Sequence, residues 1–314
     1  MKLSLAIAGI FIVLPLALPS YALADFAIYF TYGIFAVSLG FLWGHVGLLS
    51  LGHAVYFGLG AYSMSAITLG MTPLPAWTTL GLLAAVIVPG LAAFILGSFF
   101  FAAKGLKGAF FGIVTLALAF IFERLAINST WLGGMNGLMN VPPAKAFGVE
   151  LYDPLPLYIA LLAVLITVIA GLEWIKATRF GLALAALREN ELRAAALGHD
   201  VQRLKVHAFT LSGMIAGLAG ALFVAQFGFA SPSLIGFTLS ADVLIWVALG
   251  GRGHLVAAAL GAIAVRFLES ALSGALGAAW PLAAGALFML SVIFLPRGLF
   301  GEIFARISAT RPRP

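Results

Sequence analysis

Apolar segments long enough to cross a lipid bilayer follow one another along almost this whole chain, and this succession constrains its fold most. Of the 314 residues, 63% are hydrophobic and only 9% are charged, and the mean hydropathy is +1.12. A helix needs about 20 apolar residues to span the hydrocarbon core, so the chain has room for roughly eight to ten spans. We therefore predict an all-α polytopic membrane protein with about eight to ten transmembrane helices, organised as a single membrane domain over residues 1–314.

Charge is concentrated in residues 176–205, the one sizeable stretch that has to lie in water. It holds six of the seventeen Lys and Arg residues, and the spacing of its apolar residues predicts two short helices. Asn190 is placed as the N-cap of a helix over residues 191–197, and Gly198 as the glycine that follows its C-terminus. A hydrated connecting loop would explain the charge, whereas leucines such as Leu182 and Leu192 favour a surface that docks a soluble partner. The candidates for this contact are Arg188, Glu189, Asn190, Glu191, Arg193 and Gly198.

The first 24 residues are compatible with two interpretations. Lys2, an apolar run and the small residues before Asp25 have the form of a secretory signal with a cleavage site. A first spanning helix would look much the same, and a polytopic chain needs no separate export signal. We therefore expect a retained helix over this segment.

Two segments interrupt the helical pattern inside apolar sequence. Residues 44–53 are broken by glycines and carry two histidines, and residues 230–237 contain Pro232. Backbone freed from a helix within a membrane is tolerated only where protein buries it or where it lines a polar cavity. We therefore predict a transport path at Ser50 and His53, with Tyr56 and Asn136 as further candidates, although a lone buried histidine is more often a packing residue. Two topologies remain open, ten full spans or eight spans with re-entrant pieces near 44–53 and 230–250.

Stripes of small residues on predicted helices indicate where membrane helices approach one another closely. Three such stripes recur at helical spacing: Ala54, Gly58, Ala61 and Ser65; Gly213, Gly217 and Gly220; and Gly253, Ala257, Gly261 and Ala264.

Basic clusters set the expected orientation, because cytoplasmic loops of membrane proteins are enriched in Lys and Arg. Ten spans would place these clusters on one side: Lys2, Lys104 with Lys107, residues 176–205, Arg252 and the four arginines beyond residue 295. Both termini are therefore predicted to be cytoplasmic, and the net charge of +6 does not indicate nucleic-acid binding.

Catalytic motifs are sparse. No glycine is followed by lysine, so the P-loop pattern is absent and this chain does not hydrolyse nucleotide through such a site. The five histidines lack the i, i+3 or i+4 spacing of metal ligands on one helix, and no metal site or membrane-embedded enzyme is expected.

Two pairs of opposite charges lie within apolar segments. Glu123 with Arg124, and Arg266 with Glu269, are either intramembrane ion pairs or functional charges. A secondary transporter or facilitative channel for a small polar solute also fits broken helices and sparse intramembrane charge.

Several blocks together resemble LivM-type permeases, the inner-membrane subunits of branched-chain amino acid ABC importers. They occur in the family's order between about residue 26 and residue 300: 44–62 (GHVGLLSLGHAVYFGLGAY), 111–119 (FGIVTLALA), 133–138 (GGMNGL), 187–198 (LRENELRAAALG), 208–213 (AFTLSG) and 250–253 (GGRG).

The resemblance implies a multi-pass permease of a bacterial inner membrane that imports branched-chain or related amino acids by alternating access. It implies a LivH-like second permease, two ABC ATPase subunits and a periplasmic substrate-binding protein as partners. ATP and magnesium would bind the ATPases, with no cofactor in this chain, and residues 176–205 would couple it to them. Relatives of this type also handle urea, short amides or aromatic acids.

Overall fold

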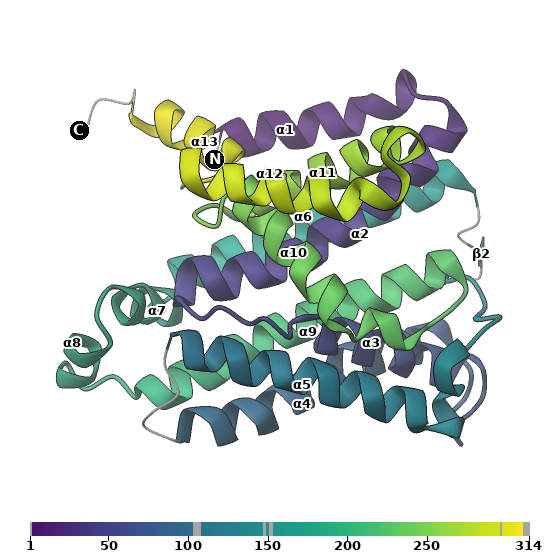
Figure 1. Ribbon diagram of the computed structural model, residues 1–314, viewed down its shortest axis with the longest axis horizontal. Helices are drawn as coiled ribbons and strands as arrows, with labels where there is room; N and C mark the ends of the chain where they lie inside the picture. The colour runs from purple at the N-terminus through teal and green to yellow at the C-terminus, as the bar shows by residue number, and fades with distance from the viewer. Residues whose placement is uncertain (1, 103–107, 147–148, 151–152, 296, 310–314) are drawn as a thin grey trace. The chain divides into compact units, whose positions relative to one another are not determined.

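The computed structural model describes residues 2–102, 108–146, 149–150, 153–295 and 297–309, and these are almost entirely helical (Figure 1). The helices are α1 Lys2–Val13, α2 Ser20–Phe41, α3 Ala54–Thr68, α4 Thr78–Ala102, α5 Ala109–Asn128, α6 Pro154–Ala177, α7 Arg179–Glu189, α8 Glu191–Ala196, α9 Val201–Phe227, α10 Phe237–Gly250, α11 Leu255–Leu276, α12 Trp280–Phe294 and α13 Leu299–Ala309. Two-residue strands β1 Lys145–Ala146 and β2 Val149–Glu150 pair antiparallel.

Seven helical segments of the described residues are long and apolar enough to cross a membrane. They are Ser20–Val46, Thr78–Ala102, Ala109–Asn128, Pro154–Ala177, Val201–Phe227, Pro232–Gly250 and Leu255–Leu272. Two shorter apolar segments, Ile7–Leu16 and Leu282–Ser291, add to these. The all-α polytopic class is confirmed.

The N-terminal segment differs from the single spanning helix expected over residues 1–24. Helix α1 ends at Val13, a short 3-10 turn covers Leu14–Leu16, and α2 begins at Ser20. Pro15 and Pro19 lie in the interruption, where proline lacks the N–H that a continuing helix would donate. The first helix therefore ends about eleven residues earlier than expected, and α2 begins before residue 24.

The chain divides into two compact units, each assembled from segments distant in sequence. Unit 1 comprises residues 1–40, 153–170 and 242–314, and unit 2 comprises residues 41–152 and 171–241. Three of the four divisions fall inside α2, α6 and α10.

Unit 2 is built on α3, α4 and α9, which pack against one another through small residues. A Cβ on Gly213 would lie 2.7 Å from Cβ of Ala93 in α4. Cβ atoms on Gly217 and Gly220 would overlap carbonyl oxygens of α4 and α3 respectively. The stripe predicted on α9 is therefore confirmed as a crossing point that larger residues would force apart.

Unit 1 contains a charged and aromatic cluster among its apolar helices. Arg266 of α11 forms an ion pair with Glu269, as one of the two sequence interpretations expected. Its guanidinium also lies 4.5 Å from the ring centre of Tyr32 in α2, and that ring contacts Trp246 of α10 edge-on. The cluster therefore links three helices of unit 1 through one partly buried cation.

Candidate transport and coupling site

The predicted interruption at residues 44–53 is present in unit 2. After α2 the backbone forms a single π-helical stretch, Leu42–Val46, and Gly47 then adopts the left-handed conformation with φ of 82°. The N–H groups of Gly47 and Leu48 both reach the carbonyl of Leu42, and no further helix forms before Ala54. Short π-helical stretches are rare, and many of them occur at functional sites.

Side chains from distant helices satisfy the backbone that this interruption frees. The N–H of Leu51 donates to Oγ1 of Thr115 in α5, at 3.0 Å. The N–H of Ala54 donates to Oγ of Ser240 in α10, also at 3.0 Å. Gly52 packs so closely on the carbonyl of Thr115 that any Cβ would overlap it. The broken segment is therefore held by protein groups, as irregular backbone inside a membrane protein has to be.

Three of the four predicted path residues lie at this interruption. Ser50 and His53 are fully buried, and Tyr56 is 2% exposed. His53 Nε2 lies 3.4 Å from Oγ of Ser212 in α9, and its ring meets Tyr56 edge-on with centres 6.0 Å apart. The hydroxyl of Ser50 is buried and forms no hydrogen bond with the described residues. The site is a packed polar cluster in a mostly apolar environment.

Asn136 lies in a different part of unit 2. It is exposed in the short 3-10 turn Gly134–Asn136, beyond the C-terminal end of α5. Helix α5 connects the two places. Thr115 anchors the interruption, and the helix continues from there for about 20 Å, at 1.5 Å per residue, to its last residue, Asn128. Asn136 is therefore not brought together with Ser50, His53 and Tyr56.

The charged stretch folds into α7 and α8, as its spacing predicts. Oδ1 of Asn190 accepts the N–H of Arg193 at 3.0 Å, which makes Asn190 the N-cap of α8. After α8, Gly198 has φ of 88°, and the N–H of His199 returns to the carbonyl of Ala194. Both predicted capping residues are confirmed.

These two helices expose polar and apolar side chains together. Leu182, Leu192 and Leu197 are 65%, 76% and 72% exposed. Five of the six predicted contact residues are exposed, and Glu191 is half-buried. By contrast Leu184 and Leu187 are buried, so α7 presents one leucine face to the unit and another outward.

Glu191 and Lys205 connect α8 to the unit. Oε1 of Glu191 accepts from Nζ of Lys205 at 2.9 Å, and Lys205 is only 7% exposed. The lysine also lies over the ring of Phe101 at 5.8 Å. A buried ammonium needs such partners, because an unpaired charge in an apolar environment is costly.

The coupling helices and the helix interruption are neighbours. A Cβ on Gly47 would lie 3.6 Å from Cγ of Arg188. A cavity of about 190 Å³ opens there, lined by residues of both parts: Val46, Gly47, Leu48, Gly108, Leu187, Arg188, Glu191 and Lys205. A movement of α7 and α8 would therefore act through direct packing on the residues that precede Ser50.

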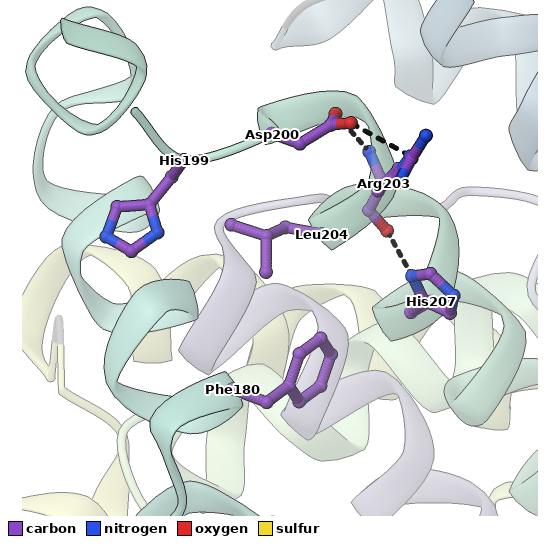
Figure 2. A pocket seen from close by; sticks show the side chains of 6 residues that line it. All are labelled: Phe180, His199, Asp200, Arg203, Leu204 and His207. Atoms are coloured by element: carbon purple, nitrogen blue, oxygen red, sulfur yellow. Dashed lines mark hydrogen bonds and ion pairs between the residues drawn. The ribbon is translucent and has the colours of Figure 1, made fainter. Parts of the chain in front are cut away.

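A larger groove of about 480 Å³ lies between α7, the connector after α8 and the start of α9 (Figure 2). Its lining combines apolar and basic groups: Phe180, His199, Asp200, Arg203, Leu204 and His207. Asp200 caps α9 by accepting the N–H of Arg203 and pairs with that guanidinium at 3.0 Å. His207 Nδ1 lies 2.7 Å from the carbonyl of Arg203. The size and lining of this groove suit a side chain of a partner protein that is largely apolar.

Sequence reasoning did not single out Thr115, Ser212 or Ser240. Each is a lone polar residue on an otherwise apolar helix face, a signal that does not say which distant group it meets. Glu123 was considered as a partner of Arg124, but its carboxylate lies beside Gly236, at the N-terminus of α10. A carboxylate there is favoured by the helix dipole. Within the described residues, no three or more His, Asp or Glu side chains gather as metal ligands.

Comparison with known proteins assigns the family. The profile of the family described as "Branched-chain amino acid transport system / permease component" matches residues 22–295. The high-affinity branched-chain amino acid transport system permease protein LivM of Salmonella typhimurium is 34% identical over 292 residues, covering 85% of this chain and 67% of its own. LivM of Escherichia coli is 34% identical over 295 residues, with the same coverage. No solved structure matches.

A more distant relative covers less of the chain. The ribose import permease protein RbsC of Haemophilus influenzae is 28% identical over 133 residues, which is 40% of this chain and 39% of its own. The match to the family profile spans most of the helices in both units and includes the interruption and the coupling helices. This chain is therefore a multi-pass inner-membrane permease rather than an enzyme, and it belongs to the family of branched-chain amino acid transport system permease components.

Proposed function

We propose that this chain imports branched-chain or chemically related amino acids as one of two permeases in an ATP-driven ABC importer. A LivH-like permease would be its membrane partner, two ABC ATPases would complete the importer with one of them bound to α7 and α8, and a periplasmic protein would deliver the substrate. Residues 1–314 would act as one permease domain, with ATP and magnesium bound on the ATPases and no cofactor in this chain. The similarity to LivM over most of the chain supports the substrate class.

The proximity of Arg188 to Gly47, which line the same cavity, is the observation that carries the mechanism. Arg188 lies on the proposed docking surface, and Gly47 begins the irregular backbone that leads to Ser50 and His53. When the ATPases close, α7 and α8 would move with them, and the interruption would shift through this contact. Alternating access then needs only a few residues of irregular backbone to change conformation, while the packed helices move as bodies.

Docking would use the helix-in-groove mode of recognition. The exposed leucines of α7 and α8 would enter an apolar groove of an ATPase, and Arg188, Glu189 and Arg193 would contact its polar rim. Asn190 and Gly198 would orient α8 through their capping geometry, and Glu191 through Lys205. The basic character of this stretch supports a cytoplasmic position, with both termini on the same side.

The test is uptake by the reconstituted complex. The two permeases, the ATPases and the binding protein are placed in liposomes, and a panel of labelled amino acids, urea and short amides is offered. We expect uptake of branched-chain amino acids that requires ATP and the binding protein. Uptake by the permease alone in response to an ion gradient would instead show the secondary transporter considered from the sequence.

The docking surface is tested separately with Arg188→Glu, Glu189→Lys and Gly198→Val. We expect each variant to remain in the membrane but to lose ATPase co-purification or substrate-stimulated hydrolysis. Glu173→Lys is the matched control, because Glu173 is also exposed but lies on α6, outside the surface. Wild-type behaviour of all three variants in both assays would make the stretch a simple connector.

A further inference from the structure

The C-terminal helix α13 has three distinct faces. Gly301 and Phe304 are buried, and Phe304 stacks on His254 with ring centres 5.2 Å apart. The backbone around Gly298 and Gly301 packs directly on Gly251, which leaves no room for side chains between them. This face therefore fixes α13 to the turn between α10 and α11 within unit 1.

The second face is apolar and is left uncovered by the residues that the structure describes. Leu299 and Ile303 lie four residues apart, on adjacent turns of one helix side, and they are 49% and 46% exposed. The third face is polar, with Glu302 and Arg306 also four residues apart and their side chains 34% and 81% exposed. Helix α13 thus has one face packed on the protein, one exposed apolar face and one exposed polar face.

The position of α13 in the chain indicates what meets the apolar face. Helix α12 ends at Phe294, and its last residues, Ile293 and Phe294, are 70% and 72% exposed, as expected of side chains facing lipid. Leu299 follows Phe294 by five positions in the sequence, so α13 begins within about 18 Å of that end. A helix so close to lipid-facing residues, with one exposed apolar face, fits an interfacial helix that lies in the membrane surface.

The charge around α13 indicates the type of lipid. From residue 295 to the end, the sequence contains four arginines and a single acid, Glu302. Arg297 precedes the helix and Arg306 lies on its polar face, and Arg252 is exposed in the turn against which α13 packs. Clusters of basic residues at a membrane surface attract anionic headgroups.

We propose that α13 is an interfacial anchor that inserts Leu299 and Ile303 into the bilayer surface and binds anionic phospholipid headgroups through Arg297 and Arg306. The anchor would hold the turn between α10 and α11 at a defined depth, because α13 and this turn pack backbone to backbone. The proposal depends on the membrane location of the chain and not on its substrate or its direction of transport.

The test uses the full-length chain in lipid nanodiscs, with a polarity-sensitive fluorophore on a single cysteine. The sequence contains no cysteine, so Ile303→Cys and Glu302→Cys each provide one site, and the two sites lie about 100° apart around the helix. We expect spin-labelled lipids to quench the probe at 303 at least about threefold more than the probe at 302. Leu299→Cys replaces Ile303→Cys if that variant does not fold. Equal quenching at both faces would overturn the proposal.

Lipid charge is tested with Arg297→Gln/Arg306→Gln. Adding phosphatidylglycerol to phosphatidylcholine nanodiscs should deepen the probe at 303 in the parent chain, and the double variant should lose most of this response. A response that survives the double variant, or none in the parent, would overturn the assignment to anionic lipid. Shielding of residue 303 that occurs only when ATPase subunits are added would show that the face docks a protein instead.

Discussion

Nζ of Lys205 lies 2.9 Å from Oε1 of Glu191, so the start of α9 and the short helix α8 are joined by an ion pair whose cation is almost entirely buried. The same lysine lies over Phe101, and the Phe101 ring contacts Phe111 and Phe209. Phe209 in turn meets Tyr56 edge-on. Packed side chains therefore lead without a gap from α8 to the region of the helix interruption.

We expect Lys205→Met to lower the free energy of unfolding, because it removes the largely buried ion pair that joins α8 to the start of α9. The loss should be about 1–3 kcal/mol, below the figure for a fully buried pair because Glu191 retains some water. Arg203→Met is the control, since the Arg203–Asp200 pair is 81% and 54% exposed and should contribute less than about 1 kcal/mol. Thermal unfolding in detergent measures both, and equal losses would contradict this ranking.

Ser240→Ala and Thr115→Ala should each destabilise the interruption. Each change leaves a backbone N–H without its acceptor in a place that water does not reach, at a cost of about 1–3 kcal/mol. Thr167→Ala is the comparison, because its hydroxyl bonds to its own helix at an exposed position. Hydrogen exchange at Leu51 and Ala54 should rise in the first two variants. Unchanged exchange there would show that these hydroxyls do not hold the segment.

Ser50→Ala should separate transport from stability. Its hydroxyl forms no hydrogen bond with the described residues, so its removal should change unfolding by no more than about 0.5 kcal/mol. If the path crosses Ser50, uptake by the reconstituted complex should fall severalfold. Ser65→Ala is a matched control, because Ser65 is equally buried but bonds within α3 to Ala61. Full uptake by Ser50→Ala would remove Ser50 from the path.

Gly198→Ala and Gly171→Ala should have opposite effects. No atom lies within 4 Å of a Cβ at either position, so crowding does not decide the outcome. Gly198 has φ of 88°, where a side chain costs about 1 kcal/mol or more, whereas Gly171 lies inside α6, where alanine gains up to about 1 kcal/mol. Helical content and thermal stability measure this. A neutral Gly198→Ala would mean that α8 can end in another way.

Orientation is tested by single cysteines at Asn136 and Arg252, both exposed and in different units. The distribution of basic residues predicts Asn136 outside and Arg252 inside. A membrane-impermeant maleimide should therefore label Asn136→Cys in intact cells, and Arg252→Cys only after permeabilisation. Labelling of Arg252→Cys in intact cells would reverse the proposed topology.

The amino-acid sequence by itself determined most of the helical elements and both ends of α8. Runs of apolar residues longer than a bilayer core predicted the spans, and Asn190 and Gly198 marked the ends of α8 because capping acts between residues a few positions apart. The interruption at 44–53 was also predictable, since its glycines break the pattern locally. The split of the first 24 residues was missed, although Pro15 and Pro19 were visible, because the apolar run was given more weight.

Only the tertiary structure decided which of these elements meet. The anchors of the interruption lie 64 and 186 residues away from the groups they bind, and no spacing in the sequence relates them. Packing also left Asn136 apart from the buried cluster and placed Arg188 against Gly47. Hydrophobic periodicity specifies which side of a helix is apolar. Which other helix packs on that side depends on where small residues allow two helices to come close. The proposed link between docking and transport therefore depends on contacts that arise only in the folded chain.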